Sequence, residues 1–157
     1  MSQDYDNAAA RGPVLFAYDG SALAKLAIGE AARQLAPERD ALVLTIWQPF
    51  DVGFVPADHI KIDAADASAV RRAAEDTAAE GTSLAKAAGF KARGAAVEGA
   101  SSWKGIVKAA EEHDASLIVL GSHGRSGLAG VLIGSVAEAV AGHSKRPVLI
   151  VHSKDKA

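Results

Sequence analysis

Residues 117–135 read LIVLGSHGRSGLAGVLIGS, and this stretch decides the fold of the chain. Its first four residues are a continuous apolar run, which is typical of a strand covered on both faces of a sheet. Five glycines follow between Gly121 and Gly134, and apolar residues with helical spacing follow Ser135. A buried strand that enters a helix through a glycine-rich turn is a building unit of α/β domains.

The rest of the chain repeats this alternation of strand and helix. Apolar runs lie at 14–18, 41–47, 92–97, 117–120 and 148–151. The run at 92–97 is the weakest, because it contains Arg93 and Gly94. Apolar residues with helical spacing lie between the runs, at 23–35, 70–88, 103–110 and 136–140. Strands that alternate with helices favour parallel pairing through right-handed crossovers. The sequence therefore predicts an α/β fold, with a single doubly wound, open, parallel five-stranded sheet and helices on both faces.

Composition excludes several functional classes. The 157 residues carry a net charge of −2 and no basic run, so we expect no nucleic-acid partner. The absence of cysteine excludes disulfides, thiol redox chemistry and zinc–thiolate sites. No apolar run approaches the ~20 residues of a membrane helix, and residues 1–12 lack the apolar centre of a signal peptide. We expect a cytoplasmic protein without a membrane partner, with residues 1–12 as a mobile tail and residues 13–153 as one domain.

The longest connection lies at 48–65 and contains Pro49, Gly53 and Pro56. Loops of this length in compact domains often have a function. Three interpretations remain open for this segment: a variable surface excursion, a lid or a dimer contact.

Ligands of open α/β sheets bind beyond the carboxyl ends of the strands, where the strand order reverses. Asp19, Gly20 and Ser21 follow the first apolar run, and residues 121–124 follow the fourth. If these two strands are neighbours in the sheet, the two segments form the two lips of one crevice.

The glycine loop has the features of a phosphate site. Glycine lets backbone amides approach an anion closely, and a helix that begins near Ser135 presents unpaired N–H groups at its positive end. Three hydrogen bonds to a charged group, at about 1.5–3 kcal/mol each, supply roughly half of the ~8 kcal/mol of micromolar binding. The loop is not a P-loop, because it lacks the Gly-Lys-Ser/Thr ending. It is not a dinucleotide fingerprint either, because that motif follows the first strand.

Gly121, Gly124, Gly134 and Ser135 form the pattern Gly-x2-Gly-x9-Gly-Ser. Together with Asp-Gly-Ser at 19–21 and Arg-Pro-Val-Leu-Ile-Val at 146–151, this pattern resembles the ATP-binding branch of the universal stress protein family. The resemblance extends over nearly the whole chain. It implies a Rossmann-like fold of the adenine nucleotide alpha hydrolase type, with strand order 3-2-1-4-5, and an adenine nucleotide, ATP, as the ligand.

The resemblance also implies roles for individual residues. Beside the nucleoside it places Ala17, Asp19 and Ile46. Near the ribose and the phosphates it places Gly121 and Gly124, and at the outer phosphates Gly134, Ser135 and Val136. The chain departs from the family pattern at Tyr18, Thr45 and Ser116, where many relatives carry a small aliphatic residue, His and Asp; the first two bear on the adenine pocket.

Several of these residues also have a purely structural interpretation. Asp19 could hold a turn with Gly20 and Ser21, and Ser135 with Glu138 matches a capping box. Arg125 either pairs with a phosphate or is a solvated loop charge. His123 is expected to be exposed rather than to act as a base or a metal ligand.

Arg125 is the one certain cation of the loop, so a triphosphate is expected to need a divalent ion, Mg²⁺ or Mn²⁺. No paired carboxylates or His–Asp arrangement stands out, and we assign no catalytic residue. The interpretation is a regulator in which bound ATP biases conformation or partner choice, with slow hydrolysis at most. The alternative is a nucleotide-using enzyme of the same fold, such as a slow ATPase or phosphotransferase. The last strand is an edge by position, and the resemblance implies that it pairs with its counterpart in a homodimer.

Overall fold

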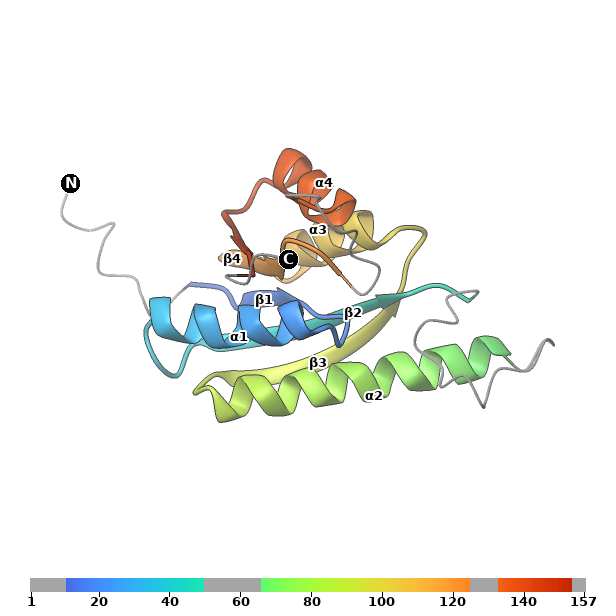
Figure 1. Ribbon diagram of the computed structural model, residues 1–157, viewed down its shortest axis with the longest axis horizontal. Helices are drawn as coiled ribbons and strands as arrows, with labels where there is room; N and C mark the ends of the chain where they lie inside the picture. Colours follow the sequence, from blue (N-terminus) through green and yellow to red (C-terminus); the bar gives the residue numbers. More distant parts are fainter. Residues whose placement is uncertain (1–10, 50–65, 125–132, 154–157) are drawn as a thin grey trace.

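The computed structural model describes residues 11–49, 66–124 and 133–153. Strands and helices alternate through these residues, with α1 and α2 on one face of the sheet and α3 and α4 on the other (Figure 1). The elements are β1 (Val14–Ala17), α1 (Ala22–Gln34), β2 (Asp40–Trp47), α2 (Asp66–Ala87), β3 (Lys91–Glu98), α3 (Ser102–Glu112), β4 (Leu117–Gly121), α4 (Ser135–His143) and β5 (Val148–Val151). The strands are parallel and follow the order β3-β2-β1-β4-β5, which confirms the predicted fold class and strand order.

β1 is the central strand, and its position decides where the site lies. Phe16 of β1 is level with Val43 of β2 and with Val119 of β4. The first and fourth strands are therefore neighbours, as the crevice prediction required. Because all strands are parallel, the segments that follow β1 and β4 leave the sheet side by side at its carboxyl edge.

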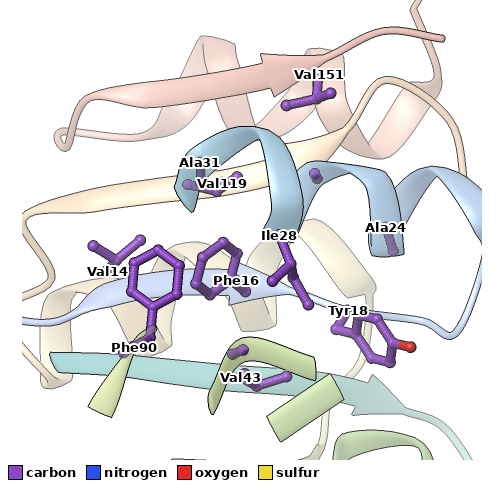
Figure 2. Close-up of a cluster of buried hydrophobic side chains, with 13 residues drawn as sticks. Val14, Phe16, Tyr18, Ala24, Ile28, Ala31, Val43, Phe90, Val119 and Val151 are labelled. Carbon is purple, nitrogen blue, oxygen red and sulfur yellow. The ribbon is translucent and has the colours of Figure 1, made fainter. Parts of the chain in front are cut away.

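Alternate residues of the apolar strands fill two separate layers of core. On the α1 and α2 face, Phe16 meets Phe90 edge to face with ring centroids 5.1 Å apart, and Ile28 of α1 packs over them (Figure 2). On the other face, Leu15, Leu44 and neighbouring residues pack beneath α3 and α4. Burial of each large apolar side chain contributes about 1.5–3 kcal/mol, so both layers hold the central strands rigidly.

The weakest apolar run forms a full strand at the edge of the sheet because a helix approaches it closely. A β-carbon on Gly94 of β3 would lie 2.3 Å from Oγ1 of Thr82 in α2. The missing side chain therefore lets α2 lie directly on β3, and the interruption by Gly94 in the sequence reflects packing rather than a loop.

Ser116, one of the departures from the family pattern, lies just before β4 at the amino edge, away from the predicted site. Its Oγ accepts a hydrogen bond from Nη2 of Arg39 at 2.6 Å, so the hydroxyl has a structural partner. Among the described helices, none is long and apolar enough to cross a lipid bilayer. The predicted mobile tail, apart from residues 11 and 12, and residues 50–65 of the long loop lie outside the described residues.

Candidate functional site

The turn after β1 forms the first lip of the crevice. Oδ1 of Asp19 accepts a hydrogen bond from the backbone N–H of Ser21 at 3.0 Å, and Gly20 between them has a φ of 83°. Oγ of Ser21 then accepts from the N–H of Ala24 at 3.1 Å and caps α1. The structural role considered for Asp19 is therefore real, but it uses only one of the two carboxylate oxygens in this turn.

The second carboxylate oxygen of Asp19 faces the segment after β4. A β-carbon placed on Gly124 would lie 2.6 Å from Oδ2 of Asp19. The two predicted lips therefore meet, and they meet where any side chain at position 124 would displace the carboxylate. The structure thus brings together Asp19 and Gly124, which lie far apart in the sequence.

The glycine loop is closed at its base. The N–H of Gly134 donates to the carbonyl of Ser122 at 2.6 Å, and a β-carbon on Gly134 would lie 2.9 Å from the same oxygen. Gly121 is equally confined, because its β-carbon would lie 2.9 Å from Cγ of Leu23 in α1. None of these positions has a positive φ, so the space around the glycine, and not its backbone conformation, selects the residue.

α4 starts at the other end of the loop without a side-chain cap. Its first residue is Ser135, and the capping position is held by Gly134, which makes no side-chain hydrogen bond. The carbonyl of Gly134 accepts from the N–H of Glu138 at 2.9 Å. The capping box considered for Ser135 and Glu138 is therefore wrong, because the helix begins at Ser135, one residue earlier than that motif requires. Ser135 and Val136 are exposed at the positive end of the helix.

Ala17 and Ile46 lie at the carboxyl ends of β1 and β2 and pack on the α3 and α4 face of the sheet. The side chain of Ile46 packs closely against two glycines that follow β3. A β-carbon on Gly99 would lie 3.1 Å from it, and a β-carbon on Gly105 would lie 2.8 Å from it. The two residues predicted beside the adenine therefore share one face and one end of the sheet.

Tyr18 and Thr45, the two departures that bear on the adenine pocket, are both engaged within the fold. The ring of Tyr18 points to the opposite face and packs between α1 and α2 (Figure 2). Its hydroxyl donates to the carboxylate of Glu80, and burial, together with this carboxylate, raises the pKa of Tyr18. Oγ1 of Thr45 donates to the carbonyl of Tyr18 at 2.8 Å. Tyr18 and Thr45 therefore stabilise the end of β1, and neither contributes to the α3 face of the sheet, where Ala17 and Ile46 lie.

His123 is less exposed than the sequence suggested. The residue is half-buried, with Nδ1 3.1 Å from Oγ of the buried Ser122. Its Nε2 is fully buried and has no hydrogen-bond partner in the described part of the chain. The expectation of an exposed His123 is corrected, because the contact of this segment with Gly134 folds the ring inward. The sequence held no signal for the buried Ser122 beside it.

Arg125 and residues 126–132 of the glycine loop lie outside the described residues. Within 11–49, 66–124 and 133–153, there is no group of three His, Asp or Glu side chains that could hold a metal ion. The carboxylate of Asp19 lies against Gly124 of the glycine loop, and Glu138 is the acidic residue in the first turn of α4.

Comparison with known proteins agrees with the fold. The model of the Universal stress protein family matches residues 11–152. Universal stress protein Rv2623 of Mycobacterium tuberculosis (strain H37Rv) is 32% identical over 145 residues, which are 88% of this chain and 44% of Rv2623. This chain spans less than half the length of the Mycobacterium tuberculosis relatives that it matches.

Two solved structures have the same architecture. MJ0577 of Methanocaldococcus jannaschii matches with a TM-score of 0.72 and 24% identity, over 92% of this chain and 97% of that one. A universal stress protein solved in complex with cAMP matches with a TM-score of 0.57 and 29% identity, over 90% of this chain and 97% of that one.

Proposed function

The chain belongs to the universal stress protein family, and from this premise we propose that it binds ATP at the carboxyl edge of its sheet and acts as a nucleotide-dependent regulator. Bound ATP would bias the order of the glycine loop or the choice of a protein partner. Hydrolysis would be slow at most.

The contact between Asp19 and Gly124 carries this proposal. It joins the turn after β1 to the loop after β4 at the point where the strand order reverses, and this is where open α/β sheets bind their ligands. A carboxylate at such a position is suited to accept hydrogen bonds from ribose hydroxyls. The universal stress protein that was solved with cAMP supports an adenine nucleotide as the ligand class.

The remaining residues fit a nucleotide laid across this edge. Ala17 and Ile46 offer an apolar wall for the adenine at the ends of β1 and β2. Gly121 and Gly124 would let the ribose and the first phosphate approach the backbone. The start of α4 would hold the outer phosphates through the amides of Ser135 and Val136, with the exposed hydroxyl of Ser135 as a further donor. The amide predicted for this role at Gly134 already donates to the carbonyl of Ser122.

The absence of a capping side chain supports a phosphate at α4. The first N–H groups of a helix need partners, which are usually side chains, water or ligands. Gly134 supplies no side-chain cap to α4 in the described part of the chain, and the helix dipole favours a negative charge at this end.

A divalent ion, Mg²⁺ or Mn²⁺, would neutralise part of the triphosphate charge when bound. Asp19 is suited to orient such an ion, and Arg125, which lies outside the described residues, is proposed as a phosphate partner. Mg²⁺ commonly binds through one or two carboxylates together with substrate phosphates, so the carboxylate of Asp19 fits this arrangement.

We also propose that the protein forms a homodimer through β5. This strand is at the edge of the sheet, and Val148, Leu149 and Ile150 are all only half-buried. They line a groove of about 540 Å³ together with Leu35 and Leu117. An uncovered apolar edge strand favours pairing with another strand. Sedimentation equilibrium tests this, and a monomer at every concentration measured would contradict it.

Timed detection of ADP, AMP and phosphate separates the regulator from the alternative of a nucleotide-using enzyme. Turnover far below about 1 s⁻¹ is expected, because phosphoryl transfer needs an in-line nucleophile in addition to a phosphate cradle. Turnover above that rate would favour the enzyme.

A further inference from the structure

The imidazole of His123 has no function in the site as proposed so far, although it lies at the centre of it. It follows the buried Ser122 and precedes Gly124, which contacts Asp19. Its Nδ1 is 3.1 Å from Oγ of Ser122, whereas its buried Nε2 has no hydrogen-bond partner among the described residues. Buried polar atoms are nearly always paired, so an exception at a candidate ligand site needs an explanation.

The hydrogen bond to Ser122 indicates which ring nitrogen carries the proton. Ser122 is only 2% exposed, and in the described part of the chain its hydroxyl has the His123 ring as its side-chain partner. If the Ser122 O–H donates to Nδ1, the hydroxyl hydrogen is satisfied and the proton of the neutral ring resides on Nε2. In the opposite tautomer that buried hydroxyl hydrogen would have no side-chain acceptor among the described residues. The arrangement therefore presents Nε2–H as a donor.

The ring lies beside the start of α4. A β-carbon on Gly134 would be 3.5 Å from Cα of His123 and 3.7 Å from Cδ2, the ring atom bonded to Nε2. The helix that begins at Ser135 has no side-chain cap. An imidazole N–H, a helix N-terminus and its amide groups thus converge on one place, and all of them favour a negatively charged acceptor.

We propose that Nε2 of His123 donates a hydrogen bond to an outer phosphate of the bound nucleotide and so makes the protein prefer nucleoside triphosphates to monophosphates. This inference rests on the proposed nucleotide site. This contact requires that a phosphate oxygen replace the atoms that cover Nε2 in the structure. The residue selects by phosphate number, whereas Asp19, Ala17 and Ile46 at the other end of the crevice respond to the nucleoside.

Two substitutions of His123 separate the two ring nitrogens. The amide of His123→Gln reaches the place of Nε2 and keeps a donor there. The amide of His123→Asn reaches only the place of Nδ1, so it keeps the contact with Ser122 but loses the outer donor. His113→Gln is the matched control, because His113 is exposed at the end of α3, at the amino edge of the sheet.

Isothermal titration calorimetry with ATP, AMP and adenosine on the full chain measures the effect. His123→Asn is expected to weaken ATP binding by about 10- to 100-fold and to leave AMP and adenosine within about twofold, whereas His123→Gln keeps most of the ATP affinity. Equal losses for all three ligands would make His123 a purely structural residue, and unchanged ATP binding would exclude the contact. Both results overturn this inference alone. A wild-type chain that binds none of the three ligands would overturn the proposed function as well. Thermal unfolding of each variant shows that the fold is retained.

Discussion

A β-carbon on Gly124 would lie 2.6 Å from Oδ2 of Asp19, so the glycine loop touches the turn after β1 at a place where a side chain would displace the carboxylate. The contact joins residues from the ends of two neighbouring strands. It brings the two predicted lips together in one site, and the predictions for Gly124 and Asp19 below depend on it.

Gly124→Ala is expected to weaken ATP binding by at least about tenfold, on the order of 1.4 kcal/mol. The new methyl group would push the Asp19 carboxylate out of position, whereas the stability of the fold should change little because residue 124 is exposed. Gly29→Ala in α1 is the matched control, since a β-carbon there meets nothing within 4 Å. Titration calorimetry checks both variants. If the two variants bound ATP with equal affinity, residue 124 would not be part of the nucleotide site.

Asp19→Asn tests whether the carboxylate acts on the nucleoside. The amide oxygen can still accept from the N–H of Ser21, so the turn and the stability of α1 should be retained. Loss of the charge is expected to weaken the binding of ATP and of adenosine by similar factors, about tenfold. A loss for ATP without any loss for adenosine would instead place Asp19 at the metal or the phosphates.

Gly81→Ala is expected to destabilise the protein, although alanine usually stabilises a helix. A β-carbon at this position of α2 would lie 2.6 Å from Cδ1 of Tyr18 and 2.8 Å from Cγ1 of Val43, both buried. Overpacking of this kind costs about 1–3 kcal/mol. Gly29→Ala, with open space around it, should stabilise the protein by about 0.5–1 kcal/mol. Urea unfolding measures the two signs, and stabilisation by both substitutions would show that α2 does not lie this close to β1 and β2.

Tyr18→Phe should reveal a pH-dependent contribution to stability. The hydrogen bond from the Tyr18 hydroxyl lowers the pKa of Glu80, with a further contribution from Lys25. A lowered carboxyl pKa contributes stability above the unfolded pKa of about 4.3, and this contribution is lost as the pH falls through the folded value. The free energy of unfolding of the wild type should exceed that of Tyr18→Phe by less than about 1 kcal/mol near neutral pH, because Glu80 is half-exposed. In urea titrations the difference should shrink in acid. A constant difference would mean that Glu80 is not the partner that matters.

The fold class could be predicted from the alternation of apolar runs and helices. The strand order is implied by the resemblance to the family, and the meeting of the two lips follows from that order. The reason for a glycine at each position of the glycine signature could not be predicted from the sequence. A side chain at Gly121 would displace Leu23, and a side chain at Gly124 would displace Asp19. Both neighbours are remote in the sequence, so no local pattern shows these contacts. Gly134 is confined by Ser122, which is nearer in the sequence.

Local patterns also failed where tertiary contacts compete with them. Ser135 and Glu138 match a capping box, but the bond between Gly134 and Ser122 fixes the helix start so that Gly134 takes the capping position. His123 lies in a polar loop sequence, yet the same bond draws its ring against the helix start. Both errors come from one long-range hydrogen bond that links the two ends of the glycine loop.

Titration of the purified full chain with ATP in the presence of Mg²⁺ tests the central claim most directly. The site at the carboxyl edge predicts a single class of binding with a dissociation constant in the micromolar range, equivalent to about −8 kcal/mol. No binding tighter than about 1 mM would contradict the nucleotide site, however closely the sheet matches its relatives.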